Sequence, residues 1–262
     1  MTSSLILTRF AFIIATLTCE KAFTQTKPIA SQENRFVKIY SRLASFIPAN
    51  YDSVSFYTDK FEKEFTGFIK NNPATLGYPF KELTDSNFCN IATSDDGNFR
   101  IYSWDTQTGG TMHFFKTICQ WRSNGKVFTK VPEREEGDAG SFCSRIFTVN
   151  TGHQQYYLAV TNAIFSTKNA MQSIAVYSIE NNRLVDTVKL FRTKTQRLNK
   201  IDVPFDFFSV KDRPERPLEL ITYDNKQKII YIPVVDDKGR VTRKYIVYQL
   251  KDHYFEFTGI AK

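Results

Sequence analysis

The chain has 262 residues, a formal net charge of +8, 42% hydrophobic residues and 24% charged residues. These fractions, together with the absence of a long low-complexity tract, exclude an intrinsically disordered protein. Aromatic residues make up 15% of the chain, including 24 Phe and 13 Tyr. Because aromatic side chains favour strands and bury large areas, this composition favours a β-rich globular fold.

Residues 1–24 have the layout of a secretory signal peptide, with a weakly basic start, an apolar stretch and small residues before Gln25. The apolar stretch of about a dozen residues falls short of the roughly 20 that span a bilayer. We therefore predict an exported, periplasmic or extracellular protein whose mature chain starts near Gln25 and has no transmembrane segment. The alternatives are a buried N-terminal helix and an uncleaved anchor.

The position of one cysteine suggests an alternative start for the mature protein. Cys19 lies inside the predicted signal, and a lipid-anchored chain starting at Cys19 is the alternative, although residues 16–18 match a lipoprotein signal poorly. Cys89, Cys119 and Cys143 remain in the mature chain, too few for a disulfide-dense scaffold. A disulfide between Cys89 and Cys143 is one possibility, and three unpaired thiols are the other.

Two amphipathic helices are predicted first, over residues 33–47 and 53–71. Their apolar residues recur at spacings of three and four, and each helix ends near a proline, Pro48 or Pro73. Both apolar faces are interpreted as core contacts. The predicted organisation is a signal peptide over residues 1–24, an N-terminal helical segment over 25–84 and a β domain over 85–262.

From about Phe88 the apolar period changes to two, and Gly, Asn or Asp separates the runs, which predicts strands and turns. The fold class expected is mainly β: an antiparallel meander of about twelve strands in three four-stranded groups, propeller-like or a sandwich, preceded by the two helices. The predicted strands are residues 88–93, 99–104, 112–121 and 126–131, then 142–150, 155–162, 173–179 and 184–191, then 218–223, 228–234, 242–250 and 254–258.

The candidate binding residues are Tyr102, Trp104, Asp105 and His113, which fall in one predicted hairpin. Aromatic faces pack on the apolar faces of sugars, while neighbouring polar groups bond to the hydroxyls. The hairpin is therefore a candidate for glycan contact. The alternative is that Trp104 packs in the core and Asp105 starts a turn.

Catalytic and cofactor motifs are absent from the sequence. There is no His-Glu-x-x-His run, nucleophile elbow, P-loop or dinucleotide fingerprint, so no cofactor is expected. No metal is expected either, because the Asp95, Asp96 and Asn98 cluster lacks the full arrangement of a calcium loop. Carboxylates that only the fold brings together would make an exported, glycosidase-like hydrolase the alternative function.

Positive charge is concentrated late in the chain, where residues 183–251 hold 16 Lys and Arg against nine Asp and Glu. For an exported protein this excess favours an envelope glycan or another anionic surface component as partner and argues against nucleic acid. A basic, soluble surface without a specific partner is the alternative. The leading function is a non-catalytic binding or structural protein of the cell envelope.

Overall fold

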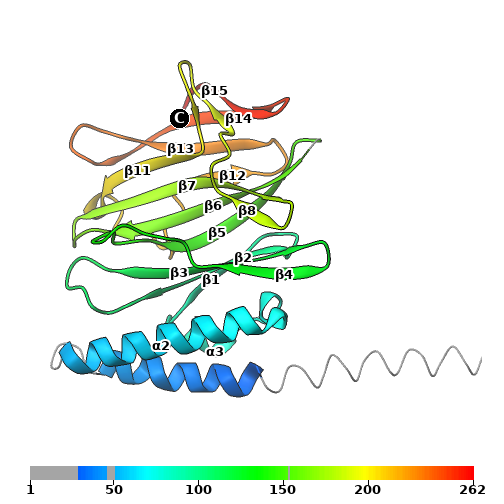
Figure 1. The fold of residues 1–262 in the computed structure, drawn as a ribbon. Helices are drawn as coiled ribbons and strands as arrows, with labels where there is room; N and C mark the ends of the chain where they lie inside the picture. Colours follow the sequence, from blue (N-terminus) through cyan, green and yellow to red (C-terminus); the bar gives the residue numbers. More distant parts are fainter. Residues whose placement is uncertain (1–28, 46–50, 153) are drawn as a thin grey trace, which may run out of the picture.

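A computed structural model describes residues 29–45, 51–152 and 154–262 (Figure 1). The predicted signal peptide and Cys19 lie outside these residues, so export and the lipid-anchored alternative stay predictions. Among the described residues, no helix is both long enough and apolar enough to cross a bilayer.

Helices occupy the N-terminal part of the structure. Residues 29–45 are helical, and α2 (Tyr51–Asn71), η1 (Pro73–Leu76) and α3 (Lys81–Asp85) follow. One face of α2 is buried at spacings of three and four, as the apolar periodicity predicts. The buried residues of α2 are Val54, Thr58, Phe61, Phe65 and Ile69.

Three sheets follow the helices. The first has the order β1-β2-β3-β4, the second β11-β7-β6-β5 with β8 paired to β7, and the third β10-β9-β15-β14-β13-β12. Sheet 1 consists of β1 (Asn90–Thr93), β2 (Phe99–Asp105), β3 (Phe115–Ser123) and β4 (Lys126–Lys130). Sheet 2 consists of β5 (Phe142–Asn150), β6 (Gln155–Ile164), β7 (Asn169–Glu180), β8 (Arg183–Val185) and β11 (Lys200–Asp206). Sheet 3 consists of β9 (Phe191–Arg192), β10 (Arg197–Leu198), β12 (Thr222–Asp224), β13 (Ile229–Val235), β14 (Val241–Lys251) and β15 (Tyr254–Ala261).

The prediction of a mainly β, antiparallel fold is confirmed, with the short β9–β15 pair as the parallel exception. The described residues form no closed propeller or barrel, because each sheet ends in edge strands. The strand predicted over residues 184–191 covers most of β8 and only the first residue of β9, and strands β10 and β11 were not predicted. β11 contains Pro204, which cannot donate to a ladder and is tolerated at sheet edges, where β11 lies.

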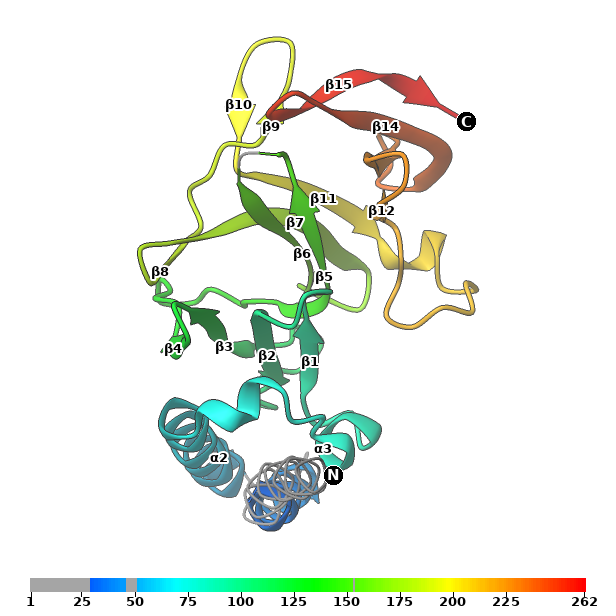
Figure 2. The ribbon, with the colours of Figure 1, turned by 90° about the vertical axis from the view of Figure 1, so that its right-hand side faces the viewer.

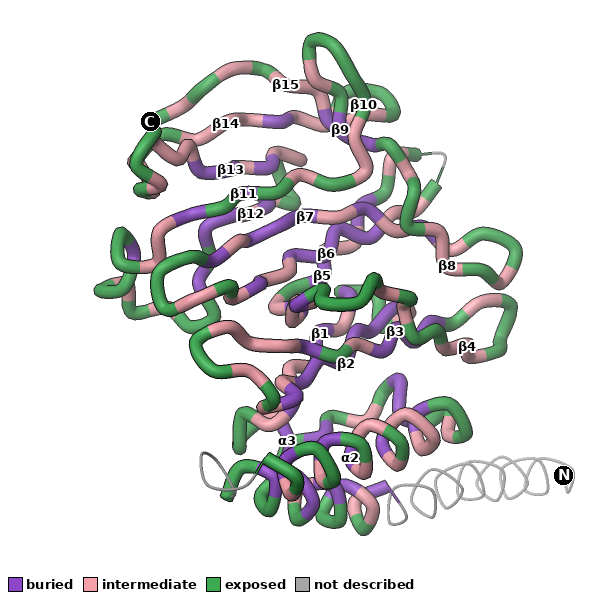
Figure 3. Tube along the Cα trace, turned by 60° about the vertical axis from the view of Figure 1, so that its left-hand side comes forward, coloured by how far each residue is buried: buried purple, intermediate pink, exposed green. Residues whose placement is uncertain are grey.

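The helices and sheets stack in layers, with the helices on one face of sheet 1, then sheet 2, then sheet 3 (Figure 2). Sheets 1 and 2 each lie between two other layers. Because successive residues of a strand point to opposite faces, both faces of these sheets contribute buried residues. On β2, for example, Tyr102 packs with the helices and Ile101 packs toward sheet 2. The helical segment therefore shares a core with the β domain, and buried residues run through all the layers (Figure 3).

Candidate functional site

Of the four residues predicted for glycan contact, two are buried in the core and two lie at the surface. Tyr102 is fully buried, with its hydroxyl 2.9 Å from the Thr75 carbonyl oxygen and 2.8 Å from Gln120 Oε1. Trp104 is 2% exposed and lies edge-on to Phe61 and Phe65 of α2. Neither ring has a face open to solvent, so at these two positions no ring is available to stack on a sugar.

Asp105 and His113 do come together, at the surface. Asp105 Oδ2 lies 2.5 Å from His113 Nδ1, and Asp105 Oδ1 accepts a hydrogen bond from the Gln107 backbone N–H at 2.8 Å. The Asp105 side chain is 13% exposed and the His113 side chain 40%. Asp105 is the last residue of β2 and the only one that is not buried, so its carboxylate can meet His113 of the loop that follows.

His113 borders a larger surface, formed by four segments that are distant in sequence: the β2–β3 loop, the β6–β7 turn, the end of β11 and the β13–β14 turn. Its backbone N–H donates to the Ile164 carbonyl at 3.1 Å, which joins the β2–β3 loop to the end of β6. The Phe207 N–H donates to the Lys168 carbonyl at 2.7 Å, and the Asp206 N–H to the Gly239 carbonyl at 2.7 Å. These bonds join the β6–β7 turn, the end of β11 and the β13–β14 turn at one side of the stack, on the left in Figure 1.

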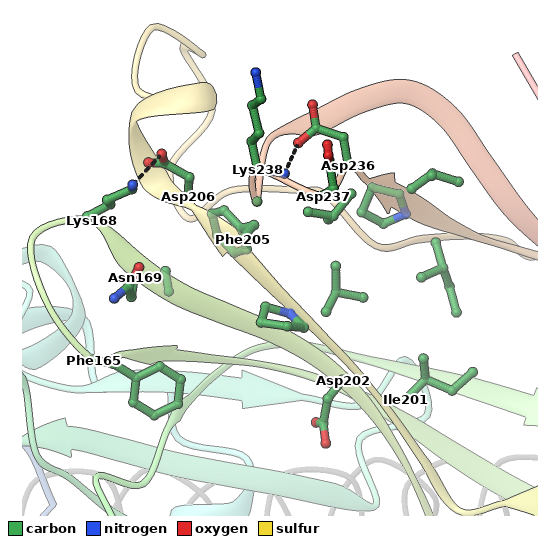
Figure 4. Close-up of a pocket in the computed structure, with 18 of the residues that line it drawn as sticks. Phe165, Lys168, Asn169, Ile201, Asp202, Phe205, Asp206, Asp236, Asp237 and Lys238 are labelled. Carbon is green, nitrogen blue, oxygen red and sulfur yellow. Dashed lines mark hydrogen bonds and ion pairs between the residues drawn. The ribbon is translucent and has the colours of Figure 1, made fainter.

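A groove of about 650 Å³ opens at this side, between β11 and the β13–β14 hairpin (Figure 4). This volume falls within the range of roughly 300–1,000 Å³ that is typical of ligand pockets. Phe165, which is 39% exposed, stands at the rim. The apolar lining consists of Phe165, Ala170, Ile201, Val203, Pro204, Phe205, Ile232, Pro233, Val234, Val235 and Ile246.

Charged side chains line the same groove. Lys168 Nζ lies 3.6 Å from Asp206 Oδ2, and this ion pair spans the β6–β7 turn and the end of β11 (Figure 4). Asp236 accepts hydrogen bonds from the backbone N–H groups of Lys238 and Arg240, both at 2.9 Å. These bonds and the Arg240 guanidinium lower the pKa of Asp236, so this carboxylate stays ionised.

The sequence offers two signals for this groove that the sequence-based predictions did not use. Ile201, Val203 and Phe205 alternate with polar residues or proline, which is the period of a strand with one buried face. Asp236 followed by Gly239 is a turn signal, since an Asp carboxylate bonds the backbone two residues on and Gly239 adopts a φ of +80°. Neither pattern shows that the strand and the turn face one another.

Within the described part of the chain, no cluster of three or more His, Cys, Asp or Glu side chains is placed to hold a metal ion. The Asp95–Asn98 turn is instead closed by its own hydrogen bonds, with Asp96 accepting from Ser94 and Asn98. Cys89, Cys119 and Cys143 are free and buried. The chain matches no protein-family model and no curated protein.

Proposed function

We propose that this chain is an exported, non-catalytic binding protein of the cell envelope and that it holds its ligand in the groove between β11 and the β13–β14 hairpin. The observation that carries the proposal is the groove itself: an apolar lining with an exposed Phe165, bordered by charged groups. Concave, largely apolar sites with a few polar groups are the usual form of a binding site. Export is supported by the composition of residues 1–24.

The carboxylates of the groove support binding rather than hydrolysis. Asp236 lies 2.8 Å from the Arg240 guanidinium, Asp206 pairs with Lys168, and Asp202 lies 2.8 Å from Lys200 Nζ. A glycoside hydrolase needs one carboxyl group that holds a proton to protonate the leaving group. Three of the four aspartates that line the groove are instead engaged by cations.

The proposal is tested by cosedimentation of the purified mature chain with isolated cell envelope. Phe165→Glu, at the groove rim, is expected to weaken binding at least tenfold. Phe56→Glu is the matched control, since Phe56 is 60% exposed on α2 and lies outside the groove. Equal binding by both variants and the unaltered protein would exclude the groove as the ligand site.

Two further arms of this experiment address the partner and export. Envelope treated with protease retains the glycan, and envelope treated with glycan-cleaving enzymes retains the protein, so the two preparations separate the partner classes. The intact mass of the chain recovered from the exporting cell is expected to correspond to a start near Gln25. A mass that includes residues 1–24 would contradict export by a cleaved signal, and a lipid-modified mass starting at Cys19 would identify the alternative form.

A second candidate function, an exported glycosidase-like hydrolase, is favoured by the four aspartates on one groove. Of these, Asp237 has an exposed side chain and no ion pair among the described residues. Turnover of aryl glycosides that Asp237→Asn abolishes would establish this function. No turnover by the unaltered protein would remove it.

A further inference from the structure

We infer that the ligand of the groove is an extended polypeptide segment that adds as a strand to the outer edge of β11. This inference rests on the proposed function, because it requires the groove to be the ligand site.

The backbone of β11 shows which groups are available. β11 pairs with β7 on one side only and is the edge strand of sheet 2. The Asn199 carbonyl accepts from Val176 N–H at 2.9 Å and the Phe207 N–H donates to the Lys168 carbonyl at 2.7 Å, so the odd-numbered residues face β7. Because hydrogen-bonding direction alternates along an antiparallel strand, the even-numbered residues turn their N–H and C=O groups outward.

Those outward groups face the groove. The Asp206 N–H, an even-numbered position, donates to the Gly239 carbonyl across the groove at 2.7 Å. The edge is therefore closed at Asp206 by the β13–β14 turn. Toward the start of β11, no described residue pairs with the outward carbonyl of Pro204 or the outward N–H and C=O groups of Asp202 and Lys200, so the edge offers these groups. Exposed strand edges of this kind bind extended peptides by strand addition.

The groove beside this edge fits the side chains of an added strand. Val234, Val235 and Ile246 are half-buried and line the groove on the side of the β13–β14 hairpin, where they would contact apolar side chains of the added strand. Four aspartates and two lysines line the groove, although the chain has a formal net charge of +8. Three of these aspartates pair with Lys168, Lys200 or Arg240, so the groove has little net charge and tolerates neutral or basic side chains at the remaining positions of the segment. A glycan would leave the row of backbone donors and acceptors along β11 without strand partners.

A capped octapeptide library supplies the probe. Alternate positions hold Val, Ile, Leu or Phe, and the positions between them hold Lys, Ser or Thr. We expect members of this library to bind. Backbone N-methylation of one alternate set of residues is expected to weaken binding of the best peptide at least tenfold, whereas N-methylation of the other set is expected to change its binding less than twofold. Absence of any binder, or equal effects of the two sets, would overturn the inference.

Variants at Asp202 test the protein side of the same bonds. Asp202→Pro removes an outward N–H without removing a bond to β7. It is expected to weaken peptide binding at least tenfold. Asp202→Asn keeps the N–H and removes the charge, so it is the matched control and is expected to bind within twofold of the unaltered protein. Equal affinity of the two variants would contradict strand addition.

Amide hydrogen exchange of the unaltered protein gives a readout that does not depend on how a variant folds. The amides of Lys200 and Asp202 are expected to exchange much faster than those of Ile201 and Val203, and to become protected when the peptide binds. Protection at Asp202 before any peptide is added would show that the edge is already occupied.

Failure of this inference can be distinguished from failure of the proposed function. If no peptide binds but Phe165→Glu still abolishes binding to protease-treated envelope, the groove binds a glycan and only the strand addition is wrong. If Phe165→Glu has no effect on any envelope preparation and no peptide binds, the groove is not the ligand site.

Discussion

The hydroxyl of Tyr157 donates a hydrogen bond to the Asp96 carboxylate at 3.0 Å, which ties the turn between β1 and β2 to strand β6 of the neighbouring sheet. The same carboxylate accepts from Ser94 Oγ at 2.6 Å and from the Gln155 side-chain amide. Sheets 1 and 2 are thus joined at this end by a polar cluster around one ionised group, in addition to their shared apolar core.

Acid is expected to weaken this link. Burial raises the pKa of Asp96, but hydrogen bonds from Ser94, Asn98 and Gln155 outweigh burial and hold the pKa below its usual value. A lowered folded-state pKa stabilises the protein above the unfolded pKa of about 4, and this stabilisation is lost as the pH falls through the folded value. Asp96→Asn should cost about 1 kcal/mol at neutral pH, because the carboxylate is only partly buried, and progressively less below about pH 4. Urea unfolding over this pH range measures the difference, and a difference that does not shrink with acid would contradict the assignment.

The interface between the helices and sheet 1 is expected to be a major source of stability. Phe61 is fully buried against Trp104, with ring centroids 5.6 Å apart. Phe61→Ala should lower the free energy of unfolding by about 3–5 kcal/mol, because it leaves a cavity in this core. Phe56→Ala, on the exposed side of the same helix, should change it by less than about 0.5 kcal/mol. Denaturant unfolding of both variants checks the prediction, and equal losses would contradict the packing described.

The three buried thiols are expected to be inert in the folded protein. Burial raises the pKa of Cys89 and of Cys119 to about 12, and burial also raises the pKa of Cys143. Because the thiolate is the reactive form, Ellman's reagent should leave all three unmodified on the timescale of minutes at mildly alkaline pH. After unfolding in concentrated guanidinium chloride, all three should react without a reductant. Rapid reaction of the folded protein, or a missing thiol after unfolding, would contradict the free, buried state.

Two glycines of one loop are expected to respond differently to the same substitution. Gly137 and Gly140 both have positive φ, at +84° and +66°. A Cβ at Gly140 would overlap the Arg134 guanidinium and lie 2.5 Å from the Phe115 carbonyl oxygen, whereas no atom lies within 4 Å of a Cβ at Gly137. Gly137→Ala should cost about 1–2 kcal/mol from backbone strain alone. Gly140→Ala should cost more, and thermal unfolding that ranks the two the other way would refute the close approach.

Local patterns in the sequence predicted several features of the fold. The change of apolar period from three and four to two, near Phe88, separates the helices from the strands in the structure as it does in the sequence. The turn at Asn124 and Gly125 lies between β3 and β4, as its residue types predict, because both residues adopt positive φ. These features depend on residues close together in the chain, and so they can be read without knowing what packs against them.

The candidate site could be predicted only in part. The turn chemistry around Asp105 is local, and the sequence placed Asp105 and His113 in one hairpin. The burial of Trp104 is not local, because it depends on α2 lying across that face of sheet 1. Strand β2 therefore carries Asp105, the partner of His113, and the buried indole of Trp104 on adjacent residues.

What the sequence by itself determined is the position of most helices and strands and the antiparallel, mainly β character, because apolar period and turn residues act over a few positions. What only the tertiary structure decided is the groove, because its walls come from β11 and from a turn more than 30 residues later, joined by the Asp206–Gly239 bond. It also decided which aromatic rings are covered and which strand edge is open. Those outcomes depend on how distant segments pack, and no local pattern records that packing.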